Sequence, residues 1–267
     1  MKNIRVVLYV TLIGLLSACS SPAAPTQTPS LVPVSPTQMP SLPPPTDTPV
    51  PVPTNTSLPP TATLEPSPTA DPLLFKDEFD GALGEGWAWT RENKTSWSLT
   101  NNPGWLEIIA RPGNIGGGNL ENILLRAIPD GNFEIETRVN FKPVGDYQVA
   151  GILIYESAAN NLQFGRAFCD SPTVCANDGF YVDMLTDNNA DGPNLATPAQ
   201  NAEISYLRLR REGNKYTMYA GYDGETWQLI GEKSSDMKPM FIGLLAGQAW
   251  SAPQPAQFDY FLVNRVP

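Results

Sequence analysis

Residues 73–267 predict an all-β fold, a sandwich or barrel of short antiparallel strands, on three observations. Segment 133–141 alternates apolar and polar residues, with Glu136 and Arg138 on its polar face, which is the period-two pattern of a strand with one face in a core. Turn signals such as Asp223-Gly224, a two-residue hairpin signature, separate such runs. No stretch of this part of the sequence keeps a helical period for three turns.

The strand candidates follow one another along the chain. Run 206–211 alternates as 133–141 does, and a Glu-Gly-Asn turn leads from it into 215–222. The other candidates are apolar or alternating runs bounded by Gly, Pro, Asn or Asp, the residues that favour turns. In chain order, we expect strands at 105–110, 122–128, 133–141, 149–156, 161–168, 179–186, 206–211, 215–222, 226–229, 241–247 and 256–264.

The N-terminus is built like an export signal that ends on a cysteine. Lys2 and Arg5 precede an apolar run over 6–16, which is too short for a membrane span of about 20 apolar residues. Leu16-Ser17-Ala18-Cys19 resembles the lipobox of bacterial lipoproteins, and this resemblance implies cleavage before Cys19 and acyl chains on it. Two or more chains make anchoring stable. We therefore expect residues 1–18 to be a lipoprotein signal peptide, the alternative being a plain signal peptide with a chance cysteine.

Residues 19–72 are expected to be the lipid-attachment cysteine and a disordered Pro/Thr-rich linker. The segment holds most of the 28 prolines of the chain and no aromatic residue. Proline fixes φ and removes a backbone donor, which excludes helix and sheet. Such a segment prefers extended polyproline II at about 3.1 Å per residue. The simplest role is a passive stalk, although a partner domain that binds prolines is an alternative.

Composition excludes several function classes. The chain has no histidine, which removes the commonest general base and the usual zinc ligand. A formal net charge of −10 argues against nucleic acid or an anionic lipid surface as a partner. Because nearby cysteines usually pair outside the cytoplasm, Cys169 and Cys175 are expected to form a disulfide, with a metal site as the alternative.

Recognisable phrases occur in a fixed order along the domain. They are Asp77-Glu78-Phe79-Asp80-Gly81, Gly86-Trp87-Ala88-Trp89, Trp97-Ser98-Leu99, Pro103-Gly104-Trp105-Leu106-Glu107-Ile108, Tyr206 to Gly213, Asp223-Gly224, Trp227, Ile242-Gly243-Leu244 and Phe258-Asp259-Tyr260-Phe261. In that order they resemble the concanavalin A-like domain at the C-terminus of family 43 β-xylosidases, over nearly the whole of 73–267. The resemblance implies a jelly-roll sandwich of two curved antiparallel sheets. It does not by itself imply a function.

The sequence does not favour an enzyme. Family 16 glucanases of a similar fold carry a Glu-x-Asp-x-x-Glu strand, with two carboxylates about 5–5.5 Å apart in a retaining mechanism. Glu134 and Glu136 are the nearest match here, but Val139 or Asn140 stands where the second glutamate is required. The five-bladed catalytic domain that accompanies this module in xylosidases has no counterpart in the sequence. A hydrolase that works through carboxylates alone, with Glu136 or Asp183, is the minor alternative.

Sugar binding needs flat aromatic faces with planar polar groups around them, and a sheet of a jelly roll supplies such a place. The best single candidate is Trp250, because it stands in a loop after a strand, where a large apolar side chain needs a reason. Trp87, Trp89, Trp97, Trp105 and Trp227 belong to the family phrases and are expected to pack in the core or at its edge. The other ligand candidates are Tyr155, Gln163, Arg166 and Tyr181, with Glu136 and Arg138 on a strand face that could join them.

The resemblance also implies one structural Ca²⁺. Related jelly rolls hold this ion between the first and last strands with an acid, a glycine carbonyl and an aspartate, and Glu78, Gly104 and Asp259 occupy those places. Asp77 is an alternate for the acid. Mixed oxygen ligands of this kind suit calcium. The alternative is that Asp259 caps the closing strand. The Asx-rich segment 187–192 is expected to be a surface loop, since Pro198 stands where a calcium loop needs its closing glutamate.

Together these features predict a surface-anchored, non-catalytic carbohydrate-binding lipoprotein of the cell envelope. The lipid on Cys19 would hold it to a membrane, its domain would be exposed outside the cytoplasm, and its partner would be a polysaccharide. The main alternative is a structural or adhesion module that binds a protein in the envelope. The sequence does not identify the glycan, the membrane or the oligomeric state.

Overall fold

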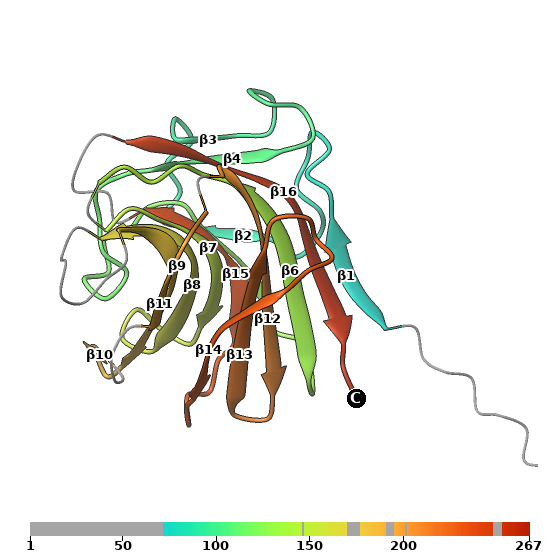
Figure 1. The fold of residues 1–267 in the computed structure, drawn as a ribbon. Coiled ribbons are helices and arrows are strands. Elements are labelled where there is room, and N and C mark those ends of the chain that lie inside the picture. Colours follow the sequence, from blue (N-terminus) through green and yellow to red (C-terminus); the bar gives the residue numbers. More distant parts are fainter. Residues whose placement is uncertain (1–71, 146, 170–176, 191–194, 201, 248–252) are drawn as a thin grey trace, which may run out of the picture. The chain divides into compact units, whose positions relative to one another are not determined.

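A computed structural model of the chain describes residues 72–145, 147–169, 177–190, 195–200, 202–247 and 253–267. These described residues form sixteen β-strands joined by turns, with no helix among them, so the predicted all-β class is confirmed. The strands make two antiparallel sheets that stack as a jelly-roll sandwich (Figure 1). No helix of the described chain is long and apolar enough to cross a membrane.

Sheet A contains eight strands and the last strand of the chain lies inside it. Seven of these strands form one continuous hydrogen-bonded path, and the eighth, β1, pairs with β16 outside that path. The order along the path is β14 (Gln228–Ser234), β13 (Lys215–Gly221), β12 (Ile204–Glu212), β6 (Phe133–Asn140), β16 (Gln254–Arg265), β4 (Leu106–Ala110) and β3 (Trp97–Ser98), with β1 at Leu73–Asp77.

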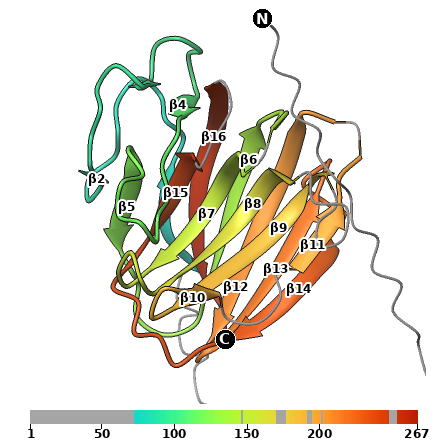
Figure 2. The same cartoon turned by 90° about the vertical axis from the view of Figure 1, so that its left-hand side faces the viewer.

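Sheet B also contains eight strands, and Figure 2 views it with sheet A behind. Strand β11 pairs with β9 beside the main path. The order along the path is β10 (Asn189–Ala190), β9 (Asn177–Thr186), β8 (Asn161–Cys169), β7 (Val149–Tyr155), β15 (Phe241–Gly247), β5 (Ile123–Ala127) and β2 (Ala88–Thr90), with β11 at Leu195–Pro198.

All eleven expected strands are present, with small shifts at their ends. The largest shift is at β14, which ends five residues later than expected and also begins two residues later, after the 223–224 hairpin. The later start of β14 follows from the loop before it, where Thr226 donates its backbone N–H to Asp223 Oδ1 at 2.7 Å. Strands β1, β2, β3, β10 and β11 were not expected, and none of them is longer than five residues.

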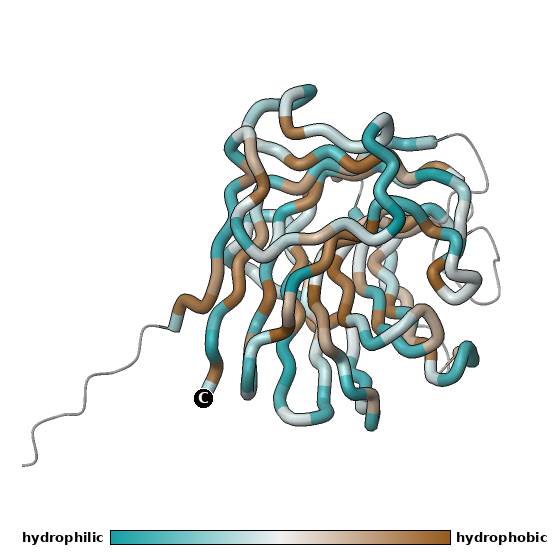
Figure 3. The backbone as a smooth tube through the Cα atoms, turned by 180° about the vertical axis from the view of Figure 1, so that it is seen from behind, coloured by the Kyte–Doolittle hydropathy of each residue, from teal (hydrophilic) through white to brown (hydrophobic). Residues whose placement is uncertain are grey.

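The main core lies between the sheets. Strand β6 alternates in burial, because Phe133, Ile135, Thr137 and Val139 are fully buried while the residues between them are partly exposed. They join a cluster that includes Ile152, Phe164 and Val182 from sheet B. This alternation along the strands is visible in Figure 3 as bands of brown and teal. Burying such side chains contributes about 1.5–3 kcal/mol each.

A second, smaller core covers the outer face of sheet B. Segment 111–122, which we call the strap, joins β4 to β5, and its Ile115 and Leu120 are 0% and 1% exposed. They pack with Leu125, Val149, Leu153 and other residues that point away from the main core. The strands β7 and β8 are consequently buried on both faces.

Candidate functional site

The outer faces of the two sheets differ in what they offer a ligand. The strap fills much of the outer face of sheet B with apolar side chains. The outer face of sheet A carries the partly exposed positions of β6, β12 and β16, which are charged, amide or aromatic apart from Ile204 and Leu262. The candidate functional site is therefore built on sheet A.

One part of this face is centred on Arg138 of β6. Its Nη1 donates to Asp259 Oδ2 of β16 at 2.8 Å, and the two side chains are 30% and 29% exposed. Its guanidinium carbon lies 5.0 Å from the ring centre of Trp105 and 5.8 Å from that of Tyr206. The cation thus lies near two aromatic rings and is held in place by a carboxylate, which favours a fixed orientation.

The neighbouring part is centred on Arg208 of β12. Its Nη2 donates to Glu136 Oε2 at 2.8 Å, and its Nε lies 3.3 Å from Glu134 Oε1. Its guanidinium carbon lies only 3.8 Å from the ring centre of Trp227. Glu136 also accepts a 2.6 Å hydrogen bond from the hydroxyl of Tyr260. One carboxylate therefore joins three strands, since β12 and β16 both pair with β6.

We name this surface the aromatic–arginine platform and define it by the residues that share it. They are Trp105, Glu136, Arg138, Tyr206, Arg208, Trp227, Asp259 and Tyr260. A row of amides extends it towards β4, where Gln257 accepts from Asn140 at 3.1 Å and donates to Glu107 at 3.0 Å. Flat rings beside planar hydrogen-bonding groups are the usual lining of a site for a small organic ligand.

The acidic side chains in the platform, and Glu134 beside it, are paired with basic or hydrogen-bonding groups. Burial raises the pKa of the Glu134 carboxyl, and the nearby Arg208 and Arg210 oppose that shift. Burial also raises the pKa of the Tyr260 hydroxyl well above its usual range, and the hydrogen bond to Glu136 adds to this. The Tyr260 hydroxyl therefore stays protonated at neutral pH and acts as a donor to Glu136.

The same pairing argues against acid–base chemistry here. A retaining glycosidase needs one carboxylate free to attack and a protonated partner about 5–5.5 Å away. Glu136 is engaged by Arg208 and Tyr260 instead, and Glu134 lies against Arg208. The carboxylates of Glu134 and Glu136 are thus held in ion pairs and hydrogen bonds.

The ligand candidates from the sequence fall on different surfaces. Glu136 and Arg138 lie in the platform, as described above. Tyr155, Gln163 and Tyr181 lie on the outer face of sheet B, where Tyr155 and Tyr181 pack against the strap cluster and Gln163 is 2% exposed. Tyr181 donates its hydroxyl to the Asn177 carbonyl at 2.7 Å.

Arg166 lies between the sheets and reaches neither open face. Its side chain is fully buried and binds the Asp178 carboxylate through two hydrogen bonds of 2.6 and 2.7 Å. It also donates to Ser205 Oγ at 2.8 Å and to the Ala202 carbonyl at 2.7 Å. We therefore leave Arg166 out of the candidate site.

Several expectations lie partly or wholly outside the described residues. Trp250 belongs to the segment 248–252, and Cys19 belongs to 1–71. Cys169, the last residue of β8, is disulfide-bonded, but its expected partner Cys175 is not among the described residues. The pairing of Cys169 with Cys175 therefore stays a prediction.

The expected calcium ligands do not form an oxygen cage. Glu78 makes an ion pair with Lys76, and Asp259 binds Arg138. Gly104 adopts a positive φ of 80° and lies beside Asp80, whose Oδ1 is 3.7 Å from where a Cβ would be. Within the described chain, no group of three or more His, Cys, Asp or Glu side chains could hold a metal ion. Calcium takes six to eight oxygen ligands, so this arrangement does not fit the ion unless Lys76 and Arg138 are displaced.

Sequence reasoning missed the aromatic members of the platform. Trp105 and Trp227 were expected to pack in the core or at its edge, yet both are half-exposed beside arginines. A signal was present, because Tyr206-x-Arg208-x-Arg210 and Glu134-x-Glu136-x-Arg138 are complementary polar faces of two alternating strands. Their pairing in register, with Glu136 opposite Arg208, required knowledge of which strands are neighbours.

The fold and this surface define a concanavalin A-like β-sandwich with a polar, aromatic sheet face. Residues 76–264 match the β-xylosidase C-terminal concanavalin A-like domain, and the chain belongs to that family. No match was found among curated protein sequences.

Solved structures support the same fold. The family 43 protein BlXynB from Bacillus licheniformis is 22% identical with a TM-score of 0.64, and the match covers 72% of this chain but 39% of that one. Xylan β-1,4-xylosidase from Bacillus halodurans is 19% identical with a TM-score of 0.61 and covers 71% and 39% of the two chains. A functionally unknown protein from Saccharomyces cerevisiae, 15% identical with a TM-score of 0.52, is matched over its whole length and 72% of this chain. This chain thus spans well under half the length of the two bacillus proteins.

Proposed function

We propose that this protein is a non-catalytic, polysaccharide-binding lipoprotein whose domain holds its ligand on the aromatic–arginine platform. The observation that carries the proposal is the placement of Trp105, Tyr206 and Trp227 beside Arg138 and Arg208 on the open face of sheet A. Aromatic faces attract the C–H surfaces of sugar rings because they carry negative charge density. The carboxylates, guanidinium groups and amides around them can bond to hydroxyl groups.

The family supports a glycan ligand, because its name and that of one structural relative, the Bacillus halodurans protein, refer to xylosidases. The lack of catalysis is supported by the paired state of Glu134 and Glu136 and by the absence of histidine from the sequence. Anchoring is supported by the Leu16 to Cys19 sequence and the proline-rich segment after it. The domain would then be exposed outside the cytoplasm, at the far end of a stalk.

The binding test uses the full chain carrying Cys19→Ala, so that no acylation is possible, on an array of xylans, arabinans and glucans. We expect binding to at least one class, and Trp227→Ala should weaken it about ten-fold or more, which corresponds to about 1.4 kcal/mol. Tyr147→Ala is the matched control, because Tyr147 is 54% exposed and lies outside the platform. No binding across the array, or equal loss in both variants, would contradict the proposed site.

Two further measurements test the other parts of the proposal. Incubation with aryl xylosides and arabinosides should give no turnover above that of a Glu136→Gln variant. In a bacterial host, the wild-type chain should fractionate with membranes and carry an acyl mass on Cys19, and Cys19→Ala should be found in the soluble fraction. A Cys19→Ala chain that stays on the membrane would refute anchoring by lipid.

A further inference from the structure

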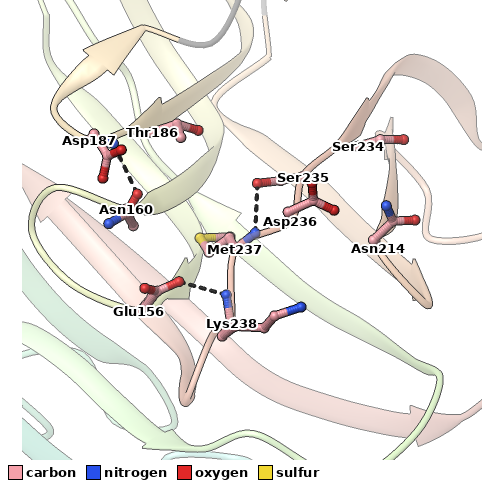
Figure 4. Close-up of a pocket in the computed structure, with 10 residues that line it drawn as sticks. All are labelled: Glu156, Asn160, Thr186, Asp187, Asn214, Ser234, Ser235, Asp236, Met237 and Lys238. Atoms are coloured by element: carbon pink, nitrogen blue, oxygen red, sulfur yellow. Dashed lines mark hydrogen bonds between the residues drawn. The ribbon is translucent and has the colours of Figure 1, made fainter.

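A pocket lies at one end of the sandwich, away from the platform residues, and is not used by the proposed function. It is formed where the β7–β8 and β9–β10 turns face Asn214 in the β12–β13 turn and the segment between β14 and β15 (Figure 4). Its volume is about 510 Å³, within the usual range of about 300–1,000 Å³ for small-molecule sites.

Hydrogen bonds to backbone groups fix the shape of the pocket. Glu156 Oε2 accepts from the Lys238 backbone N–H at 2.6 Å, and Asn160 Oδ1 accepts from that of Asp187 at 2.9 Å. Ser235 Oγ accepts from the Met237 N–H at 3.1 Å. Figure 4 shows these three bonds as dashed lines around the opening. The walls are therefore formed before any ligand arrives, which lowers the ordering cost of binding.

Other polar groups of the lining have no partner among the described residues. They are the carboxylates of Asp187 and Asp236, the side-chain amide of Asn214 and the hydroxyl of Ser234. Met237 supplies apolar surface and packs against the main core. The pocket thus offers two strong acceptors, one amide that both donates and accepts, one hydroxyl and one apolar wall.

This set of groups selects the chemistry of the ligand. A vicinal diol on a sugar ring donates to carboxylates and accepts from amide and hydroxyl donors, while its C–H face contacts a thioether. An anionic sugar is disfavoured, because Asp187, Asp236 and Glu156 outnumber the one cation, Lys238. A metal ion is disfavoured too, since no group of three metal-ligating side chains was found in the described chain.

We infer that this end pocket binds one neutral sugar ring through a vicinal diol and is a second glycan subsite, separate from the platform. The inference deepens the proposed function and rests on it for the ligand class. The platform would hold the body of a polysaccharide, and the end pocket a chain end or a side-branch residue.

The test follows the side-chain and backbone amide signals of Asn160 and Asn214 by NMR in the full Cys19→Ala chain, with methyl β-xyloside and methyl α-arabinofuranoside as probes. At least one probe should shift these signals, and the double variant Asp187→Asn, Asp236→Asn should weaken its binding ten-fold or more. The Asp187 backbone has a positive φ of 51°, which Asn tolerates as well as Asp, so the fold should survive. Asp130→Asn, on an exposed turn, is the matched control and should bind as the wild type does.

The outcomes separate this inference from the proposed function. If polysaccharide binding depends on Trp227 but neither probe shifts the pocket signals, the end pocket is not a subsite and the platform stands. If the probes bind in the pocket and Trp227→Ala leaves all glycan binding unchanged, the end pocket stands and the platform fails. Two outcomes would overturn the end pocket as a sugar site. One is that the double variant binds the probes as tightly as the wild type does. The other is that Ca²⁺ shifts the Asn160 and Asn214 signals while neither sugar does.

Discussion

Arg208 and Trp227 form the closest cation–aromatic pair on the outer face of sheet A, with the guanidinium carbon 3.8 Å from the ring centre. The pair joins β12 to the residue that immediately precedes β14, across the intervening strand β13. Because Glu136 of β6 holds the same guanidinium, the orientation of the Trp227 ring depends on four adjacent strands of one sheet. A ligand that stacks on this ring would meet a surface whose geometry is set by the fold.

Arg208→Lys should weaken both the surface and ligand binding. Lysine keeps the charge but loses the planar group that stacks on Trp227 and contacts two carboxylates. We expect the domain to lose about 1 kcal/mol of stability, measured by urea unfolding, and polysaccharide affinity to fall about five-fold. Arg265→Lys, at the exposed end of β16, is the control and should change neither. Unchanged affinity in Arg208→Lys would mean that the platform does not hold the glycan.

Gly165→Ala should destabilise the domain severely. Gly165 of β8 lies opposite Gly151 of β7, and a Cβ on it would come within 2.1 Å of the Ala150 carbonyl oxygen. The two strands would have to separate, at a cost of about 3 kcal/mol or more. Gly131→Ala is the comparison, since a Cβ there meets nothing within 4 Å and costs only the strain of its φ of 78°, about 1–2 kcal/mol. Equal losses at the two positions would show that the close approach of β7 and β8 is not needed.

The sequence predicts an element of this structure well where the pattern of residues within the element itself reveals it. Strand β6 was predicted within one residue, because Phe133 to Val139 alternate with charged residues. Strands β7 and β8 lack alternation, since the strap buries their second face, and they were found from apolar runs. The strap could not be predicted, because Ile115 and Leu120 stand among glycines and asparagines. Their burial depends on contacts with the strands of sheet B, which the sequence does not show.

The candidate site was predicted less well for the same reason. Glu136 and Arg138 were correctly placed on a polar strand face, but their partners Arg208, Tyr260 and Asp259 are more than 70 residues away. Arg166 was predicted to contact the ligand, yet it is buried with Asp178. A single sequence shows which residues share a face of one strand, but it does not show which strands are neighbours in the sheet.

Calcium should not stabilise the domain measurably. The carboxylates of Glu78 and Asp259 are each neutralised by a basic side chain of the protein, so an ion would have to displace Lys76 and Arg138. We expect the Tm of the full Cys19→Ala chain to be the same in millimolar Ca²⁺ and in EDTA. A higher Tm in calcium that disappears in Asp259→Asn would instead establish the ion that the family resemblance implies.

Asp183→Asn should stabilise the domain at neutral pH and much less in acid. Burial raises the pKa of the Asp183 carboxyl above its usual 3.8, and Lys233 offsets this only in part. A group whose folded-state pKa is raised contributes stability in full below its unfolded pKa and loses it as the pH rises through the folded pKa. The wild type therefore bears the cost of a buried charge at pH 7, and the neutral amide does not.

Urea unfolding at about pH 4 and pH 7 checks this prediction. The gain of Asp183→Asn over the wild type should be small at the lower pH and largest at the higher. Asp130→Asn, on the exposed turn before β6, is the control and should show no such gain. A gain that is equal at both pH values would mean that the amide acts by packing and not through the titration of Asp183.

Arg166→Ala should unfold the domain more readily and should not act on glycan binding alone. The change removes the two hydrogen bonds to Asp178 and those to Ser205 and Ala202, and breaking such a buried pair costs about 3–5 kcal/mol. Arg166→Met keeps much of the buried volume, so combining it with Asp178→Asn should recover part of the loss because no unpaired charge remains. Urea unfolding and the glycan array separate the two roles. A folded Arg166→Ala chain with wild-type stability and no glycan binding would return Arg166 to the list of ligand contacts.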